Sequence, residues 1–283
     1  MARTRHKMHE VYKVVRAENG AQLYGDAAKP GKEVDHGTDL VEAAMLGRIV
    51  TVKRLLGGDI DGAYVNRLYV RLHVNRQRGE DGATALYCAA QNGHFSVVLI
   101  LLEHGADPNI ARIIDGGTPM ITAARKGHVE VVALLLAHTA DPNKANTADG
   151  QHPTFNAAQE GHLEVVALLL KHNADPNKGR RDGCTSIYIA AKCGHIEVGT
   201  LLLKHNADPN QTGNGGQTPL YMAAYTGNVE ATALLLKHSA DPTMAVGGTY
   251  GTTPLRTANH FGHAAIADML RAACRGQQQQ HAR

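Results

Sequence analysis

The sequence has no tryptophan among its 283 residues, and aromatic side chains make up only 4% of it. A core must therefore be built mainly from Ala, Leu and Val, which suits thin layers better than one thick centre. No apolar run approaches the ~20 residues that a membrane-spanning helix needs, so we expect no membrane insertion. The formal net charge of +3 is too small, by itself, to indicate a nucleic acid or an anionic membrane as partner.

The four cysteines include no Cys-x-x-Cys pair. We expect free thiols, which are typical of a reducing compartment, and therefore a cytoplasmic location. The basic start at residues 1–7 is not followed by an apolar stretch, so we expect no secretory signal.

A Gly-His step followed by an apolar run recurs along the chain. Residues 127–136 read GHVEVVALLL, and close variants begin at Gly161 and Gly194. The corresponding glycines follow one another at intervals of 33 to 35 residues: Gly93, Gly127, Gly161, Gly194, Gly227 and Gly262. A fixed period in this range is typical of stacked small units that share one continuous core.

One unit, residues 116–149, illustrates the local structure. Thr118 and Pro119 follow a glycine turn and suit the start of a helix. Gly127 ends that helix, and the apolar residues of 129–136 recur at helical spacing. The segment 140–143, Ala-Asp-Pro-Asn, cannot continue a helix. Each unit is therefore predicted to be helix, turn, helix and projecting hairpin loop.

This pattern resembles the ankyrin repeat. The family's Thr-Pro-Leu-His-x-Ala-Ala run is matched by TPMITAA at 118–124 and TPLYMAA at 218–224, and Ala-Asp-Pro-Asn recurs at 140–143, 174–177 and 207–210. The resemblance covers residues 36–275 and implies an all-α solenoid of about seven repeats. One feature departs from the family. The histidine of its first-helix motif, whose hydrogen bond orders the helix start, is replaced in every repeat: Val41, Tyr87, Ile121, Phe155, Tyr188, Tyr221 and Arg256.

Three segments fall outside the repeat. Residues 1–35 are interpreted as a capping helix with a linker, or alternatively as a disordered leader. Residues 276–283 are interpreted as a short disordered tail. The loop at 57–80 is about a dozen residues longer than its counterparts, and part of it alternates like a strand. It is either a tolerated surface insertion or a basic contact finger that carries Arg67, Arg71, Arg76 and Arg78.

The sequence contains 17 histidines, but most of them fall into two registered series, one at each end of the second helices. Metal ligands converge on one point, whereas these histidines are spaced one per repeat, so we expect structural roles and no metal. The Gly-His of the first series resembles a family feature that orders the loops between repeats. There is no Gly-x-Ser-x-Gly elbow and no phosphate-binding loop, so we expect no catalysis and no cofactor.

The resemblance places partner contacts on the hairpin tips and on the concave face of the first helices. The matching positions vary between repeats, whereas the second helices stay nearly constant. Basic residues gather at the centre of this face and aromatic residues at one end. We expect partner-binding residues at Arg125, Lys126, Gln159, Lys192, Arg181, Tyr225, Tyr250 and Phe261.

The sequence thus indicates a monomeric, non-catalytic module or scaffold that binds another protein. One alternative is a regulatory or targeting subunit of an enzyme complex, or a microbial effector acting in a host cell. Another is nucleic-acid binding through the basic finger at 67–78, although the small net charge disfavours it.

Overall fold

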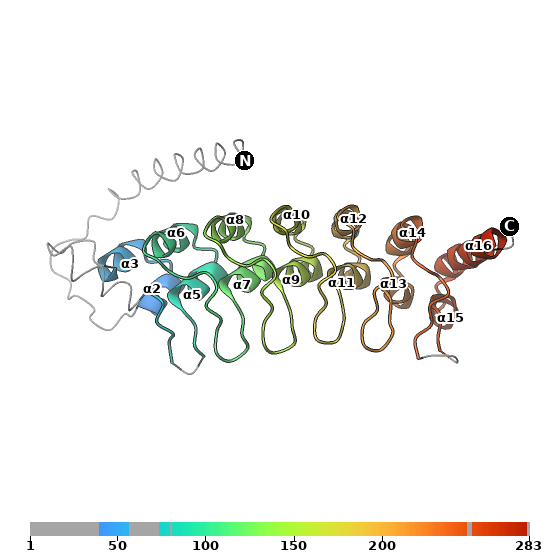
Figure 1. Ribbon diagram of the computed structural model, residues 1–283, viewed down its shortest axis with the longest axis horizontal. Helices are drawn as coiled ribbons and strands as arrows, with labels where there is room; N and C mark the ends of the chain where they lie inside the picture. The colour runs from blue at the N-terminus through green and yellow to red at the C-terminus, as the bar shows by residue number, and fades with distance from the viewer. Residues whose placement is uncertain (1–39, 57–73, 80, 248–250, 282–283) are drawn as a thin grey trace. The chain divides into compact units, whose positions relative to one another are not determined.

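The computed structural model describes residues 40–56, 74–79, 81–247 and 251–281, which form seven pairs of helices. The first helices are α2 (Leu40–Met45), α5 (Ala85–Gln91), α7 (Pro119–Lys126), α9 (Pro153–Glu160), α11 (Ser186–Cys193), α13 (Pro219–Thr226) and α15 (Pro254–His260). The second helices are α3 (Ile49–Leu55), α6 (Phe95–Glu103), α8 (Val129–Ala137), α10 (Leu163–Lys171), α12 (Ile196–Lys204), α14 (Val229–Lys237) and α16 (Ala264–His281). Each layer packs against the same layer of the next repeat (Figure 1). The predicted all-α solenoid is confirmed.

The first helices begin and end at residues that favour helix termini. Thr118 Oγ1 accepts the N–H of Ile121 at 3.3 Å, which satisfies a backbone donor that has no partner within the helix. Pro119 occupies the first helical turn, where its missing N–H costs nothing. Gly127 ends the helix in the left-handed region, with φ 74°, which glycine tolerates best. Other first helices carry the same threonine cap: Thr84, Thr185, Thr218 and Thr253.

The core is continuous through the stack. Alanines such as Ala123 and Ala124, both fully buried, let neighbouring first helices approach closely. Helix α3 contributes the fully buried Val52, and the second helices from α6 to α16 each contribute a leucine that is at most 1% exposed: Leu101, Leu135, Leu169, Leu202, Leu235 and Leu270. The position of the missing family histidine is apolar and buried in several repeats, as at Ile121 and Phe155. The start of α7 is instead held by the Thr118 cap, whereas α9 has His152 at the cap position and no side-chain cap bond.

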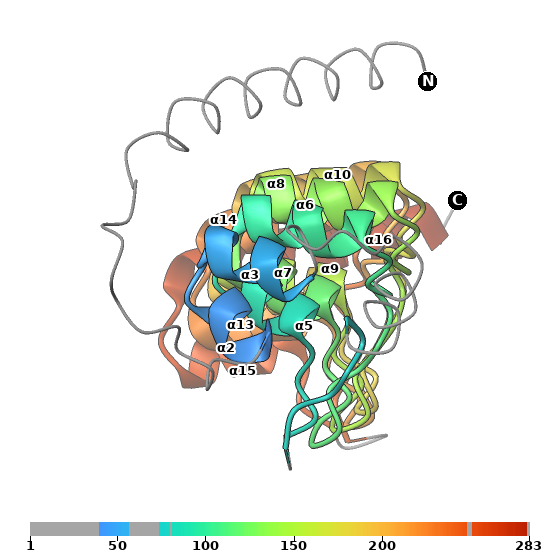
Figure 2. The ribbon, with the colours of Figure 1, turned by 90° about the vertical axis from the view of Figure 1, so that its left-hand side faces the viewer.

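The hairpins are joined by an asparagine ladder. Asn109 Oδ1 accepts the N–H of Asp141 in the next repeat at 2.8 Å, and its Nδ2 donates to the carbonyl of Thr139 at 3.1 Å. Asn75, Asn143, Asn177 and Asn210 make the same two bonds. Figure 2, viewed along the stack, shows the hairpins projecting together on one side of the helices.

The structure describes parts of two segments outside the regular repeat. Helix α16 continues to His281, through residues 276–281 that were predicted as a disordered tail, because glutamine favours helix and only Gly276 disfavours it. The predicted long loop at 57–80 includes Val74, which is 1% exposed, and Asn75, which belongs to the asparagine ladder. The last part of that loop is therefore ordinary repeat hairpin. The remaining part, 57–73, and the N-terminal 1–35 lie outside the described residues.

Candidate interaction surface

The C-terminal ends of the first helices carry the side chains that vary most from repeat to repeat. We define the helix-end row as the two residues before the turn glycine in the third to seventh repeats: Arg125, Lys126, Gln159, Glu160, Lys192, Cys193, Tyr225, Thr226, His260 and Phe261. Gln159 is half-buried and the other nine are exposed. The fold leaves these positions free because the packed faces of the same helices are occupied by alanine and larger apolar residues.

In the third and fourth repeats, the backbone beneath this row is fixed by the histidines that open the second helices of the following repeats. His162 Nε2 bonds the carbonyl of Arg125 at 3.1 Å, and His195 Nε2 bonds that of Gln159 at 3.0 Å. A carbonyl only accepts, so Nε2 carries the hydrogen in each bond. The His162 ring also covers Gly127 so closely that a Cβ there would lie 2.7 Å from the ring. Earlier repeats repeat the arrangement with His94 and His128.

The aromatic end of the row is a ring cluster that spans two repeats. Tyr225 and Phe261 meet edge to face, with ring centroids 4.8 Å apart. His260 lies edge-on to Phe261 at 4.9 Å, and His263 stacks against it at 6.3 Å. Tyr225 and Phe261 nevertheless each keep 46% of their surface exposed. An exposed pair of large rings, already fixed by mutual contact, offers an apolar anchor site at low entropic cost.

The basic part of the row is unpaired. Within the described residues, Arg125, Lys126 and Lys192 take part in no ion pair, and all three are exposed. Between them stands one acidic group, Glu160, which accepts a hydrogen bond from the neighbouring Gln159 amide at 3.4 Å. The row therefore presents cations on the third and fifth repeats and an anion on the fourth.

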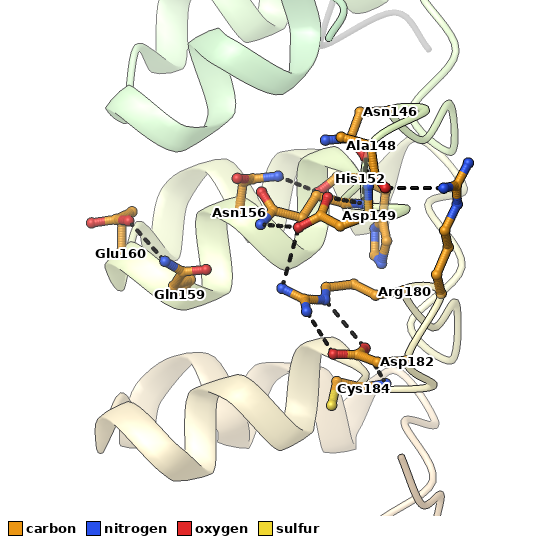
Figure 3. A network of polar contacts seen from close by, with 12 residues as sticks. Asn146, Ala148, Asp149, His152, Asn156, Gln159, Glu160, Arg180, Asp182 and Cys184 are labelled. Atoms are coloured by element: carbon orange, nitrogen blue, oxygen red, sulfur yellow. Dashed lines mark hydrogen bonds and ion pairs between the residues drawn. The ribbon is translucent and has the colours of Figure 1, made fainter. Parts of the chain in front are cut away.

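The opposite ends of the first helices carry a charged network of a different kind. Figure 3 shows Gln159 and Glu160 at one end of α9, and His152 and Asp149 at the other. There the Arg180 guanidinium bonds the Asp182 carboxylate, pairs with Asp149 at 3.5 Å, and lies 5.0 Å from the Phe155 ring centroid. Arg180 therefore joins two successive repeats and is not available to a partner.

The ionisation of this network follows from its contacts. The hydrogen bond to Asp182 raises the pKa of Arg180, against the effect of burial. Burial alone would raise the pKa of Asp182, but the bonds from Arg180 and from the Cys184 N–H lower it below its ordinary value. Arg112 and Asp115 form a similar pair beside Tyr87, and their hydrogen bond lowers the pKa of Asp115. These charges stabilise the hairpins.

His152 is a site that sequence reasoning missed. It occupies the cap position of α9, where other repeats have threonine, and it is fully buried. Its Nε2 donates to the Lys178 carbonyl at 2.9 Å, while Nδ1 is buried without a partner. Burial is the main cause that lowers the pKa of His152 to about 4. The signal was present in the sequence, since His152 replaces the first threonine of the family motif.

The structure brings together six of the eight residues predicted to bind a partner. Arg125, Lys126, Gln159, Lys192, Tyr225 and Phe261 all belong to the helix-end row. Arg181 does not: it lies in the hairpin before α11, where its guanidinium donates to the Ala148 carbonyl at 3.0 Å. Tyr250 lies outside the described residues.

The described parts of the chain contain no group of three or more His, Cys, Asp or Glu side chains placed to hold a metal ion. Among the same residues, no helix combines the length and apolar character that crossing a bilayer requires.

Comparisons with known proteins identify the repeats. Family models described as "Ankyrin repeats (3 copies)" match residues 40–146 and 140–213, and one described as "Ankyrin repeats (many copies)" matches residues 194–236. The crystal structure of the human ASB11 ankyrin repeat domain superposes with a TM-score of 0.69 at 25% identity, covering 83% of this chain and 97% of that one. A palmitoyltransferase, AKR1 of Lachancea kluyveri, is 36% identical over 78 residues, which are 28% of this chain but only 9% of that protein. Over residues 40–236 the helices, their period and the family models agree, and the chain belongs to the ankyrin repeat proteins.

Proposed function

We propose that this protein is a non-catalytic interaction module that binds a partner protein across the helix-end row. The observation that carries the proposal is the contrast in charge pairing along the first helices. At the hairpin ends, Arg112 and Arg180 are paired with carboxylates and Arg181 donates to a backbone carbonyl. Arg125, Lys126 and Lys192 take part in no ion pair within the described residues.

The side-chain types in the row support the same conclusion. Tyrosine and arginine recur among the residues that contribute most to protein interfaces, and phenylalanine is enriched there. Histidine bonds hold the backbone at Arg125 and Gln159, and the rings of Tyr225 and Phe261 hold each other in place. Such a surface loses little conformational freedom when a partner binds, so more of its contact energy contributes to affinity.

The test is partner capture by proximity labelling with the full chain. We expect a variant with alanine at Arg125, Lys126, Tyr225 and Phe261 to lose partners that the native chain retains, because removal of interface anchors costs ~2 kcal/mol or more each. The matched control replaces Glu130 and Glu164 with alanine. Both are exposed on second helices and belong to the other layer.

Unfolding curves must accompany this comparison, because Tyr225 and Phe261 pack against each other across two repeats. A second variant, restricted to Arg125 and Lys126, removes no such contact. If the row variants and the Glu130/Glu164 control capture the same partners in the same amounts, the binding surface is elsewhere.

The alternative through the basic finger at 67–78 falls mostly outside the described residues. Its described arginines, Arg76 and Arg78, are exposed. Replacing both with glutamate should leave protein capture unchanged if the helix-end row is the site.

A further inference from the structure

We propose that the helix-end row recognises an extended peptide segment with a fixed alternation of charge: acidic over the third repeat, basic over the fourth, acidic over the fifth, and aromatic or large aliphatic over the sixth and seventh. This inference rests on the proposed function and specifies the chemistry of its partner.

The charges of the row set the alternation. Arg125 and Lys126 present two unpaired cations on the third repeat, and Lys192 presents one on the fifth. Glu160 stands between them on the fourth, with only the weak 3.4 Å bond from its neighbour Gln159. A uniformly acidic partner would place a like charge opposite Glu160, which is unfavourable. A partner with a cation at that step satisfies every charge in the row.

The spacing follows from the stacking of the repeats. Neighbouring first helices pack directly against each other, and packed helices lie about 8–10 Å apart. A polyproline-II chain advances about 3.1 Å per residue and returns to the same face every third residue, so one repeat corresponds to about three residues of the partner. The partner would carry its two acidic groups about six residues apart, with the basic group midway.

The aromatic end fixes the position of the segment. Tyr225 and Phe261 form one exposed surface that reaches from the sixth repeat to the seventh. A large apolar side chain about three to six residues beyond the second acidic group would lie on these rings. Charge alone would allow the partner to shift by two repeats, because the third and fifth repeats are both basic. The single apolar site removes that ambiguity.

A nucleic acid fits this row poorly. Its phosphates would repeat one sign of charge along the whole backbone, so one of them would meet Glu160. A peptide can alternate sign, whereas a phosphate backbone cannot. The competing ligand is therefore an explicit arm of the test.

The experiment selects binders from a displayed library of random 16-residue peptides on the full chain. We expect enriched peptides to carry two acidic residues six apart, a basic residue between them and an aromatic or leucine beyond. Synthetic peptides of that pattern, measured by fluorescence anisotropy, should bind at least tenfold more tightly than scrambled peptides of the same composition. A 15-nucleotide single-stranded oligothymidylate serves as the nucleic-acid arm.

Charge exchange then tests the register within the folded protein. A peptide whose central basic residue is replaced by an acidic one should bind the Glu160→Lys variant about twofold to fivefold more tightly than it binds the native chain. The original peptide should bind the variant more weakly than the native chain by about the same factor. The matched control is Glu164→Lys, which makes the same exchange on the second helix of the same repeat. It should change neither affinity.

The outcomes separate this inference from the function on which it rests. Enriched peptides that require the row but lack the alternation overturn the register and leave the interaction module in place. A failure to enrich any peptide, or tighter binding of the oligothymidylate through the row, also overturns it. Peptides that bind the row variants as well as the native chain, together with unchanged partner capture, overturn both proposals.

Discussion

The two ends of the first helices are both held in place by hydrogen bonds between repeats, but they differ in which side chains those bonds occupy. At the hairpin end, asparagines such as Asn109 and cations such as Arg180 are consumed in bonds within and between repeats. At the other end, histidines such as His162 hold only the backbone and leave the side chains free. A basic residue in this protein is therefore a candidate for partner binding only when no nearby carboxylate already pairs with it.

The largest effect on stability should come from protonating His152, at the hairpin end of α9. Its pKa in the folded protein is about 4, below the ordinary value of 6.5, because burial disfavours the charged ring. As pH falls below 6.5 the unfolded chain binds the proton first, so stability present at pH 7 is lost progressively towards pH 4. The loss should be on the order of 3 kcal/mol, measured as urea unfolding across that range.

The matched variant is His152→Thr, which removes the titrating ring and restores the cap found at Thr118. Other groups titrate in both proteins, so the difference between the two pH profiles isolates His152. Profiles of equal slope between pH 6.5 and pH 4 would show that the ring is not held neutral by burial.

A smaller effect separates the two kinds of cation. Arg180→Ala removes the contact with Phe155 and leaves Asp149 and Asp182 without their partner, so it should cost about 1–2 kcal/mol, moderated by solvent screening. Arg125→Ala should change stability by less than ~0.5 kcal/mol. Guanidinium chloride is unsuitable because it screens charge, so the measurement is urea unfolding. Equal losses for both variants would remove the distinction between the two ends.

The smallest effect concerns the C-terminal ends of the second helices, where the hairpins begin. Thr139 adopts φ 64°, a left-handed conformation that a β-branched residue resists, while the matching position in the second repeat is Gly105. Thr139→Gly should therefore stabilise the protein by about 0.5–1 kcal/mol, and the bond from Asn109 to the backbone carbonyl is retained. Thr243→Gly, at a position without positive φ, is the control and should destabilise. A lower thermal midpoint for Thr139→Gly would contradict the strain.

Much of this architecture follows from the sequence because it is local or periodic. Thr118, Pro119 and Gly127 define a helix by their own conformational preferences, and the 33 to 35-residue period carries the assignment along the chain. The pairing of Arg180 could not be predicted, because it depends on where Asp149 of another repeat places its carboxylate. The burial of His152 depends equally on tertiary packing. The helical continuation to His281 lies beyond the repeat period, so the periodicity does not predict it.

The histidine bonds make the order of folding along the stack matter. Each one holds a carbonyl of the preceding repeat, so the backbone at Arg125 in the third repeat is held only once His162 of the fourth repeat is in place. On the ribosome, a repeat that has already emerged would keep a loose helix end until its successor folds. Gly262, in the last of these turns, has no covering side chain, and there the ring of Phe261 leans back on Tyr225 instead. In the repeats that carry these bonds, the helix-end row would thus be completed one repeat behind synthesis, and a prematurely terminated chain would display its final position unanchored.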